Sequence, residues 1–193
     1  WNVPALMQSL AERGPDRARF VEKKYIAILD QPVQSSGELR YVPPDRLEKH
    51  TLQPRTESLV LAGDQLTLLQ GPRTRRLALA DLPDGGLAIN SLRGTMAGDL
   101  AALRRGWSVT LFGERRLWTL SLTPLSAAVA QYIETVLIEG QQDQIASIEI
   151  RQAAAIGLAG GSIEDSTGED GEPIFTIAAA TERLRAASEA ARS

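Results

Sequence analysis

Residues 117–123 read LWTLSLT, and this short run decides how the rest of the chain is interpreted. Apolar and polar side chains alternate strictly along it, so Trp118, Leu120 and Leu122 share one face. A period of two indicates a strand with one buried and one exposed face. We therefore predict a β-strand here, in an antiparallel sheet that covers a core on one side.

The same strand signal extends in both directions from this run. Gly63-Asp64 separates two short apolar runs, as in a β-hairpin, and Gly140–Asp143 is flanked in the same way. Strands this closely spaced favour an antiparallel meander over βαβ units. The further predicted strands are Arg19–Leu29, Gly37–Val42, Arg46–Leu52, Ser58–Leu61, Gln65–Leu69, Arg75–Leu79, one beginning at Trp107, Tyr132–Glu139 and Gln144–Ile150.

Two regions have helical periodicity instead. Apolar residues recur at helical spacing in Val3–Glu12, which Gly14-Pro15 ends, and again between Gly86 and Arg105. About nine or ten strands thus meet only two or three helices, and a sheet that large must curl or be covered. We predict an α+β fold: a large curved antiparallel sheet, an incomplete β-barrel, covered by two or three helices. Where the helices cover it imperfectly, an apolar cavity suited to a lipid remains.

Composition excludes several classes of function. The 193 residues are 43% hydrophobic and 23% charged, as in an ordinary globular protein, and the net charge of −3 does not attract nucleic acid. The absence of cysteine excludes thiol catalysis, cysteine-ligated metals and disulfides. No apolar run approaches the ~20 residues of a membrane span. No nucleophile elbow, zinc-protease helix, phosphate loop or dinucleotide fingerprint is present, so we expect no enzyme activity, no cofactor and no metal.

The charged residues and the single histidine have structural interpretations. We interpret His50 as a partly exposed strand residue, since a catalytic base needs a nucleophile within hydrogen-bond reach. The pairs Arg75-Arg76, Arg104-Arg105 and Arg115-Arg116 are interpreted as solvated edges. The alternative is that they meet anionic headgroups or an acidic partner. An acidic run is interpreted as a solvated loop rather than a divalent cation site; it contains Glu164, Asp165, Glu169, Asp170 and Glu172.

The stretch 18–54, ARFVEKKYIAILDQPVQSSGELRYVPPDRLEKHTLQP, resembles the LolA-like family of periplasmic outer-membrane lipoprotein carriers. The hairpin around Gly63-Asp64-Gln65 and the strand WTLSLTP over Trp118–Pro124 continue the resemblance, which covers residues 1–152. The matching residues in the first stretch are Phe20, Glu22 and Lys23, then Ser36, Gly37, Leu39, Tyr41 and Pro44, and finally Pro54.

The resemblance implies an open, unclosed barrel with a lid of helices and a cavity for acyl chains. It implies cargo received from an inner-membrane release complex and delivered to an outer-membrane receptor, hence a periplasmic location. A removed signal peptide is then the expected reason why the chain starts at Trp1. Family members latch the lid with an arginine directly before the proline that ends the second strand. Here that position is Pro43, so Arg40 or Arg46 would have to substitute.

Residues 153–193 differ in composition from the body and are predicted to form a separate strand, loop and helix extension of uncertain origin. The run Ser162–Glu172 is expected to be a loop, Pro173–Ile177 a strand and Ala178–Arg192 a helix. Residues 155–192 resemble a fragment of the phosphoenolpyruvate mutase/isocitrate lyase superfamily, in which Glu164 matches a glutamate of the magnesium network. A lone strand, loop and helix cannot enclose such an active site.

The leading hypothesis is therefore a periplasmic carrier of lipoprotein or lipid-like cargo. The alternatives are a non-catalytic adaptor of an exporter complex and, more remotely, a lyase-related fragment. A contiguous apolar void would favour the carrier over the adaptor. The residues predicted to line the cavity are Val21, Leu39, Leu59, Leu61, Leu66, Leu68, Ile89, Leu92, Met96, Trp118, Leu120 and Leu122.

Overall fold

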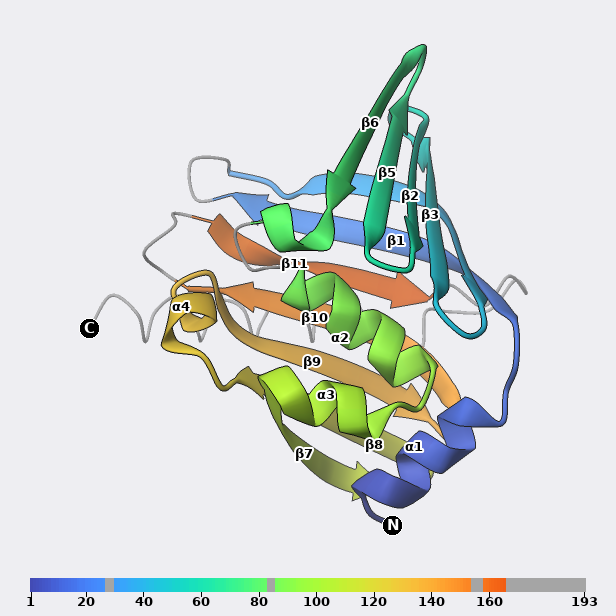
Figure 1. Cartoon of the computed structure of the whole chain (residues 1–193), viewed down its shortest axis with the longest axis vertical. Helices are drawn as coiled ribbons and strands as arrows, with labels where there is room; N and C mark the ends of the chain where they lie inside the picture. Colours follow the sequence, from blue (N-terminus) through green and yellow to red (C-terminus); the bar gives the residue numbers. More distant parts are fainter. Residues whose placement is uncertain (27–29, 83–85, 154–157, 166–193) are drawn as a thin grey trace.

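The computed structural model describes residues 1–26, 30–82, 86–153 and 158–165. Within these residues the chain forms an eleven-stranded antiparallel sheet with helices on its concave side (Figure 1). The predicted α+β architecture is confirmed. The strands are β1 (Asp16–Ile26), β2 (Val33–Val42), β3 (Arg46–Gln53), β4 (Glu57–Ala62), β5 (Gln65–Gln70), β6 (Arg73–Ala78), β7 (Trp107–Glu114), β8 (Leu117–Pro124), β9 (Ile133–Gln141), β10 (Gln144–Gln152) and β11 (Leu158–Asp165).

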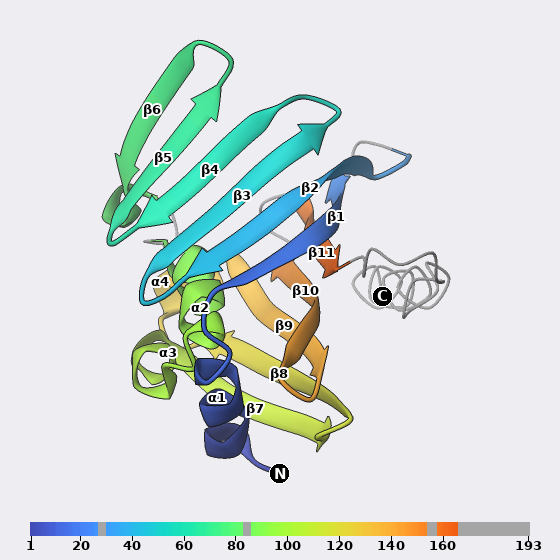
Figure 2. The ribbon, with the colours of Figure 1, turned by 90° about the vertical axis from the view of Figure 1, so that its right-hand side faces the viewer.

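The sheet is open because its two outermost strands do not pair with each other. The strand order is β6-β5-β4-β3-β2-β1-β11-β10-β9-β8-β7, so two meanders are joined through β11. Figure 2 shows the two halves of the sheet bending toward each other, with the helices in the opening between them. A large twisted sheet curls in this way so that one face is buried against its helices.

The central position of β11 was not expected from the sequence. Asp165 pairs with Phe20 on β1, and Glu164 pairs with Ser147 on β10. The prediction of a loop is thus wrong for residues 162–165. These residues pair because β1 and β10 each offer a backbone edge to a further strand. The local pattern of side chains does not show that such an edge is available. The predicted strand 173–177 and helix 178–192 lie outside the described residues.

Local signals explain where the helices begin. α1 (Val3–Ala11) starts at Asn2, whose side chain accepts a hydrogen bond from Ala5 N–H at 3.0 Å. α3 (Leu100–Gly106) starts in the same way at Asp99. The remaining helices are α2 (Leu87–Met96), the short α4 (Ala127–Ala130) and a 3₁₀ turn, η1 (Leu79–Asp81).

The predicted helical region 86–105 is divided into α2 and α3 at Gly98. Gly98 has φ +66°, and a Cβ there would lie 2.1 Å from the main-chain oxygen of Met7 in α1. Only glycine allows this link to press against α1. The helices α1, α2 and α3, which we call the lid, are therefore packed on one another as well as on the sheet.

Two apolar clusters form the core. The larger lies between α1, α3 and strands β7–β10 and includes Trp118, Leu120 and Leu122, each at most 1% exposed. The smaller lies between α2 and strands β2–β5 and includes Leu61 and Leu66. Packing against two separate half-sheets leaves a space between the clusters.

Candidate functional site

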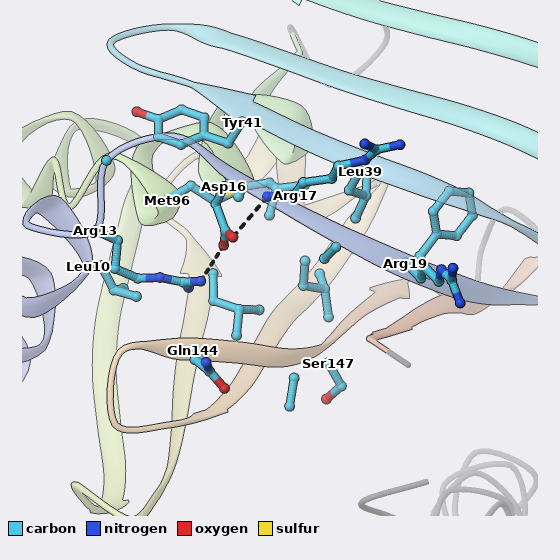
Figure 3. Close-up of a pocket in the computed structure, with 17 residues that line it drawn as sticks. Leu10, Arg13, Asp16, Arg17, Arg19, Leu39, Tyr41, Met96, Gln144 and Ser147 are labelled. Atoms are coloured by element: carbon cyan, nitrogen blue, oxygen red, sulfur yellow. Dashed lines mark hydrogen bonds and ion pairs between the residues drawn. The ribbon is translucent and has the colours of Figure 1, made fainter. Parts of the chain in front are cut away.

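A cavity of about 480 Å³ lies between the lid helices and the place where the two half-sheets diverge. α1 and α2 cover it, and β1, β2 and β10 form its walls (Figure 3). The volume falls in the range of ~300–1,000 Å³ that is usual for small-molecule sites. Its apolar lining consists of Leu10, Ala18, Phe20, Leu39, Leu92, Met96, Ile145, Ala146 and Ile148.

The cavity lies beside the parts of β1 and β10 that extend beyond their pairing with β11 in the described residues. On β1 that pairing reaches Phe20, which lies opposite Asp165. Residues 16–19 of β1 and 144–146 of β10 therefore have no strand of the described chain between them. Consecutive residues of both strands line the cavity, as expected where strand edges as well as faces form a wall. The cavity thus lies where the two half-sheets join and where the two core clusters meet.

Polar groups gather at the mouth. Arg13, just after α1, donates hydrogen bonds to the Asp16 carboxylate and, at 2.7 Å, to the main-chain oxygen of Asp143. Gln144 and Ser147 lie on the β10 side of the cavity, and the exposed Arg17 and Arg19 line it from β1 (Figure 3). Arg13 therefore ties the end of α1 to the start of β1 and to the β9–β10 turn. The result is an apolar interior with a polar rim, which suits an amphiphile.

A largely buried ion pair lies beside the apolar wall. Lys49 Nζ is 2.6 Å from Glu22 Oε2 and 5.0 Å from the centroid of the Phe20 ring. Ser35 Oγ–H donates to the same carboxylate at 2.9 Å. Burial alone would raise the pKa of Glu22, but the hydrogen bonds and charge of Lys49, with Ser35 and Lys24, hold that pKa below its ordinary value. Glu22 is therefore kept ionised and holds Lys49 over the Phe20 ring.

The residues predicted from the sequence fall into four groups. Leu39, Leu92 and Met96 line the cavity. Leu61 and Leu66 belong to the smaller core cluster with Leu59 and Ile89 against it, and Leu68 is half-buried on β5. Trp118, Leu120 and Leu122 belong to the larger cluster. Val21 lies on the opposite face of β1 from Phe20, because successive strand residues alternate between faces.

Several lining residues were not predicted from the sequence. Phe20 was noted only as part of a motif, although the alternation that includes Ala18 and Phe20 would have selected the correct face of β1. Ile145 and Ile148 come from β10, which was predicted as a strand but not as a wall of the cavity. Leu10 comes from α1 and could be assigned only once the helix was placed.

His50 has polar neighbours on the outer face of the sheet. Its Nδ1 lies 2.9 Å from Ser58 Oγ, and its Nε2 lies 2.8 Å from Glu48 Oε2. Hydrogen bonds from His50 and Arg46 hold the pKa of Glu48 below its usual value. A hydroxyl is thus within reach of the histidine, contrary to what the sequence suggested.

This arrangement resembles a catalytic triad in its atoms but not in its surroundings. Ser58 lies inside the sheet, where its backbone pairs with His50 on β3 and with Leu69 on β5. The backbone amides near Ser58 therefore take part in strand pairing. Acyl transfer needs donors aimed at a developing oxyanion. Ser58 does not line the described cavity either. The network serves to join β3 to β4.

Arg93 connects the lid to the sheet. It donates to the main-chain oxygen of Gly63 in the β4–β5 turn and lies 3.7 Å from the Asp64 carboxylate. Arg46, one candidate for replacing the missing latch at Pro43, instead bonds Glu48 at 2.5 Å. Arg40 is exposed. Within the described chain, then, α2 is joined to the sheet by an arginine of its own, Arg93, rather than by one from the second strand.

The three arginine pairs are at the surface. All six members of the three arginine pairs are exposed, in agreement with their interpretation as solvated edges. Among the described residues no group of three or more His, Asp or Glu side chains could hold a metal ion. No helix in the described ranges is long and apolar enough to cross a bilayer.

Comparison with solved structures finds similar chains at low sequence identity. A LolA superfamily protein from Nitrosomonas europaea is 11% identical with a TM-score of 0.45, over 93% of this chain and 99% of that one. A chain of the MucA/MucB complex of Pseudomonas aeruginosa is 16% identical with a TM-score of 0.47, over 84% of this chain and 55% of that one. An outer membrane lipoprotein-sorting protein domain from Vibrio parahaemolyticus is 11% identical with a TM-score of 0.44, over 88% of this chain and 94% of that one.

No curated protein matches this chain. A family model described as "Outer membrane lipoprotein carrier protein LolA-like" matches residues 2–178, which is most of the sequence and extends well past residue 152. The chain belongs to the LolA-like family of outer membrane lipoprotein carrier proteins.

Proposed function

We propose that this protein is a periplasmic carrier that holds an acyl chain of a lipoprotein or lipid-like cargo and shuttles it from the inner to the outer membrane. The observation that carries the proposal is the cavity of about 480 Å³, with an apolar interior and a polar rim, beneath the lid helices. At about 30 Å³ per water-sized group, this volume holds roughly 16 such groups. That is room for one hydrocarbon tail with its headgroup at the rim.

The mechanism is burial without chemistry. Each buried methylene contributes about 0.8 kcal/mol, so ~14 of them contribute on the order of 11 kcal/mol before the cost of opening the lid. That figure corresponds to a dissociation constant of roughly 10 nM, so the cargo stays bound during transit. In the proposed cycle, a release complex loads the cargo at the inner membrane, and a receptor that offers comparable burial accepts it at the outer membrane.

Native mass spectrometry of protein purified from its own host tests the proposal, together with displacement of a fluorescent fatty acid. We expect a bound amphiphile and displaceable probe binding. Met96→Trp and Ala146→Phe, which fill the cavity from opposite walls, should each weaken probe binding at least tenfold. Leu125→Trp is the matched control, because Leu125 is 60% exposed and does not line the cavity.

Protein that is always free of ligand, with probe binding unaffected by both filling variants, would instead favour the non-catalytic adaptor of an exporter. That alternative uses the same sheet but needs no occupied interior. The cavity is the reason for preferring the carrier.

A further inference from the structure

One end of the molecule presents apolar and basic side chains together. The N-terminal residues, the β7–β8 turn and the β9–β10 turn all lie at this end in both views (Figures 1 and 2). Phe112 is 58% exposed, Leu117 51% and Trp1 43%, although side chains of this size are usually buried. Arg115 and Arg116, in the turn between Phe112 and Leu117, are exposed. We call these five residues the tip.

The tip side chains are arranged as a group. Phe112 pairs with Thr119, and Leu117 lies two residues before Thr119, so Phe112 and Leu117 point to the same outer face. The Arg115 guanidinium lies 5.7 Å from the centroid of the Trp1 ring. Such stacking holds an aromatic ring and a cation side by side. Glu114 is the acidic residue next to the two arginines in the chain.

The tip is joined to the cavity mouth by hydrogen bonds. Gln142 N–H donates to the main-chain oxygen of Arg115 at 2.7 Å, and Trp118 Nε1–H donates to that of Gln142 at 3.0 Å. In the same turn the main-chain oxygen of Asp143 accepts from Arg13, which lines the cavity. A surface that contacts the tip is therefore close to the mouth.

We infer that the tip docks on the surface of an anionic lipid bilayer and presents the cavity mouth to it. The boundary between lipid headgroups and acyl chains favours tryptophan, phenylalanine and leucine side chains that lie beside arginine. The guanidinium groups complement anionic headgroups. Two arginines lie in the chain between the exposed Phe112 and Leu117, so apolar and basic side chains are interleaved as at a bilayer interface. This docking goes beyond the proposed carriage of cargo and does not require it.

Vesicles of phosphatidylethanolamine with phosphatidylglycerol are the probe. We expect the protein to float with them, more weakly as salt rises, and its tryptophan emission to shift to the blue. The shift reports on the tip because Trp107 and Trp118 are 3% and 1% exposed, which leaves Trp1 as the exposed tryptophan of the three. The double variant Phe112→Ser/Leu117→Ser should lose vesicle affinity at least tenfold, and Arg115→Gln/Arg116→Gln should lose the salt dependence.

Leu125→Ser is the matched control, since it removes a similarly exposed leucine that follows the opposite end of β8. It should bind vesicles as the unaltered protein does. Absence of vesicle binding by the unaltered protein overturns the inference and points to a protein partner for the tip. Retained binding by the Phe112/Leu117 variant, or equal affinity for phosphatidylcholine vesicles, also overturns it. Fluorescent fatty acid binding in solution should be unchanged in the Phe112/Leu117 variant, which separates this test from that of carriage.

Discussion

At the scale of single residues, Gly140 is a position where only glycine fits. A Cβ there would lie 2.3 Å from the indole ring of Trp118 and 2.2 Å from the main-chain oxygen of Gln144. We predict that Gly140→Ala lowers the free energy of unfolding by about 1–3 kcal/mol, the usual cost of overpacking a core. Urea denaturation measures the change.

The control for Gly140 is Gly71→Ala. Gly71 has φ +56°, but a Cβ there would meet nothing within 4 Å. Its substitution should therefore cost only the left-handed backbone strain, about 1–2 kcal/mol. If Gly140→Ala unfolds at the same urea concentration as the unaltered protein, the crowding around Trp118 does not exist as described.

The ion pair between Glu22 and Lys49 predicts a dependence of stability on pH. The pKa of Glu22 is lowered in the folded protein from 4.5, so the pair stabilises the fold above about pH 4.5. That contribution is lost as the pH falls below 4.5 through the folded-state pKa.

Glu22→Gln should reduce this acid dependence and cost about 1–3 kcal/mol at neutral pH, because Lys49 loses a charged hydrogen-bond partner. Thermal unfolding followed from pH 3 to pH 7 measures both effects (roughly the range over which carboxylates titrate). Glu134→Gln, at an exposed position, controls for the loss of one negative charge. An acid slope in Glu22→Gln as steep as that of the unaltered protein would argue against the paired state.

At the scale of elements, the lid helix α2 is connected to the sheet through Arg93, whose side chain is 18% exposed. Arg93→Met should keep the apolar stem and remove the bonds to Gly63 and Asp64. We expect faster amide exchange in α2 and faster dissociation of a bound acyl probe, because local opening needs fewer broken contacts.

Arg104→Met is the matched control for Arg93→Met. Arg104 is an exposed arginine in the last turn of α3. Its substitution should leave both rates unchanged. Equal dissociation rates for the two variants would show that Arg93 does not hold the lid.

At the scale of the whole molecule, the two core clusters meet at the cavity, so an occupant should stabilise the entire fold. A ligand present at 100 times its dissociation constant adds about 2.7 kcal/mol to the free energy of unfolding. We expect a long-chain fatty acid to raise the melting temperature of the unaltered protein in proportion to the logarithm of its concentration. Differential scanning calorimetry measures this.

The cavity-filling variant Met96→Trp should show little of that increase. Detergents without a long acyl chain provide the matching ligand control. A rise in melting temperature of the same size in the filled variant would place the fatty acid elsewhere on the protein.

By itself the sequence determined the class of fold and most of its elements. The alternation in 117–123 and the helical spacing in 3–12 are local patterns, and both elements are present as β8 and α1. The motifs in 18–54 were enough to indicate the family. Such features can be read from the chain because backbone geometry repeats every two or 3.6 residues.

Only the tertiary structure decided where the cavity lies. Core and cavity need the same apolar residues, so Leu39 and Leu120 look alike in the sequence, yet Leu39 lines the cavity and Leu120 is fully buried. The difference arises from how β11 joins the two half-sheets. Leu39 pairs with Ala18 on β1, next to this join, whereas Leu120 lies on β8 within the larger cluster. Pairing between strands so distant in the chain depends on available backbone edges, which no local pattern encodes.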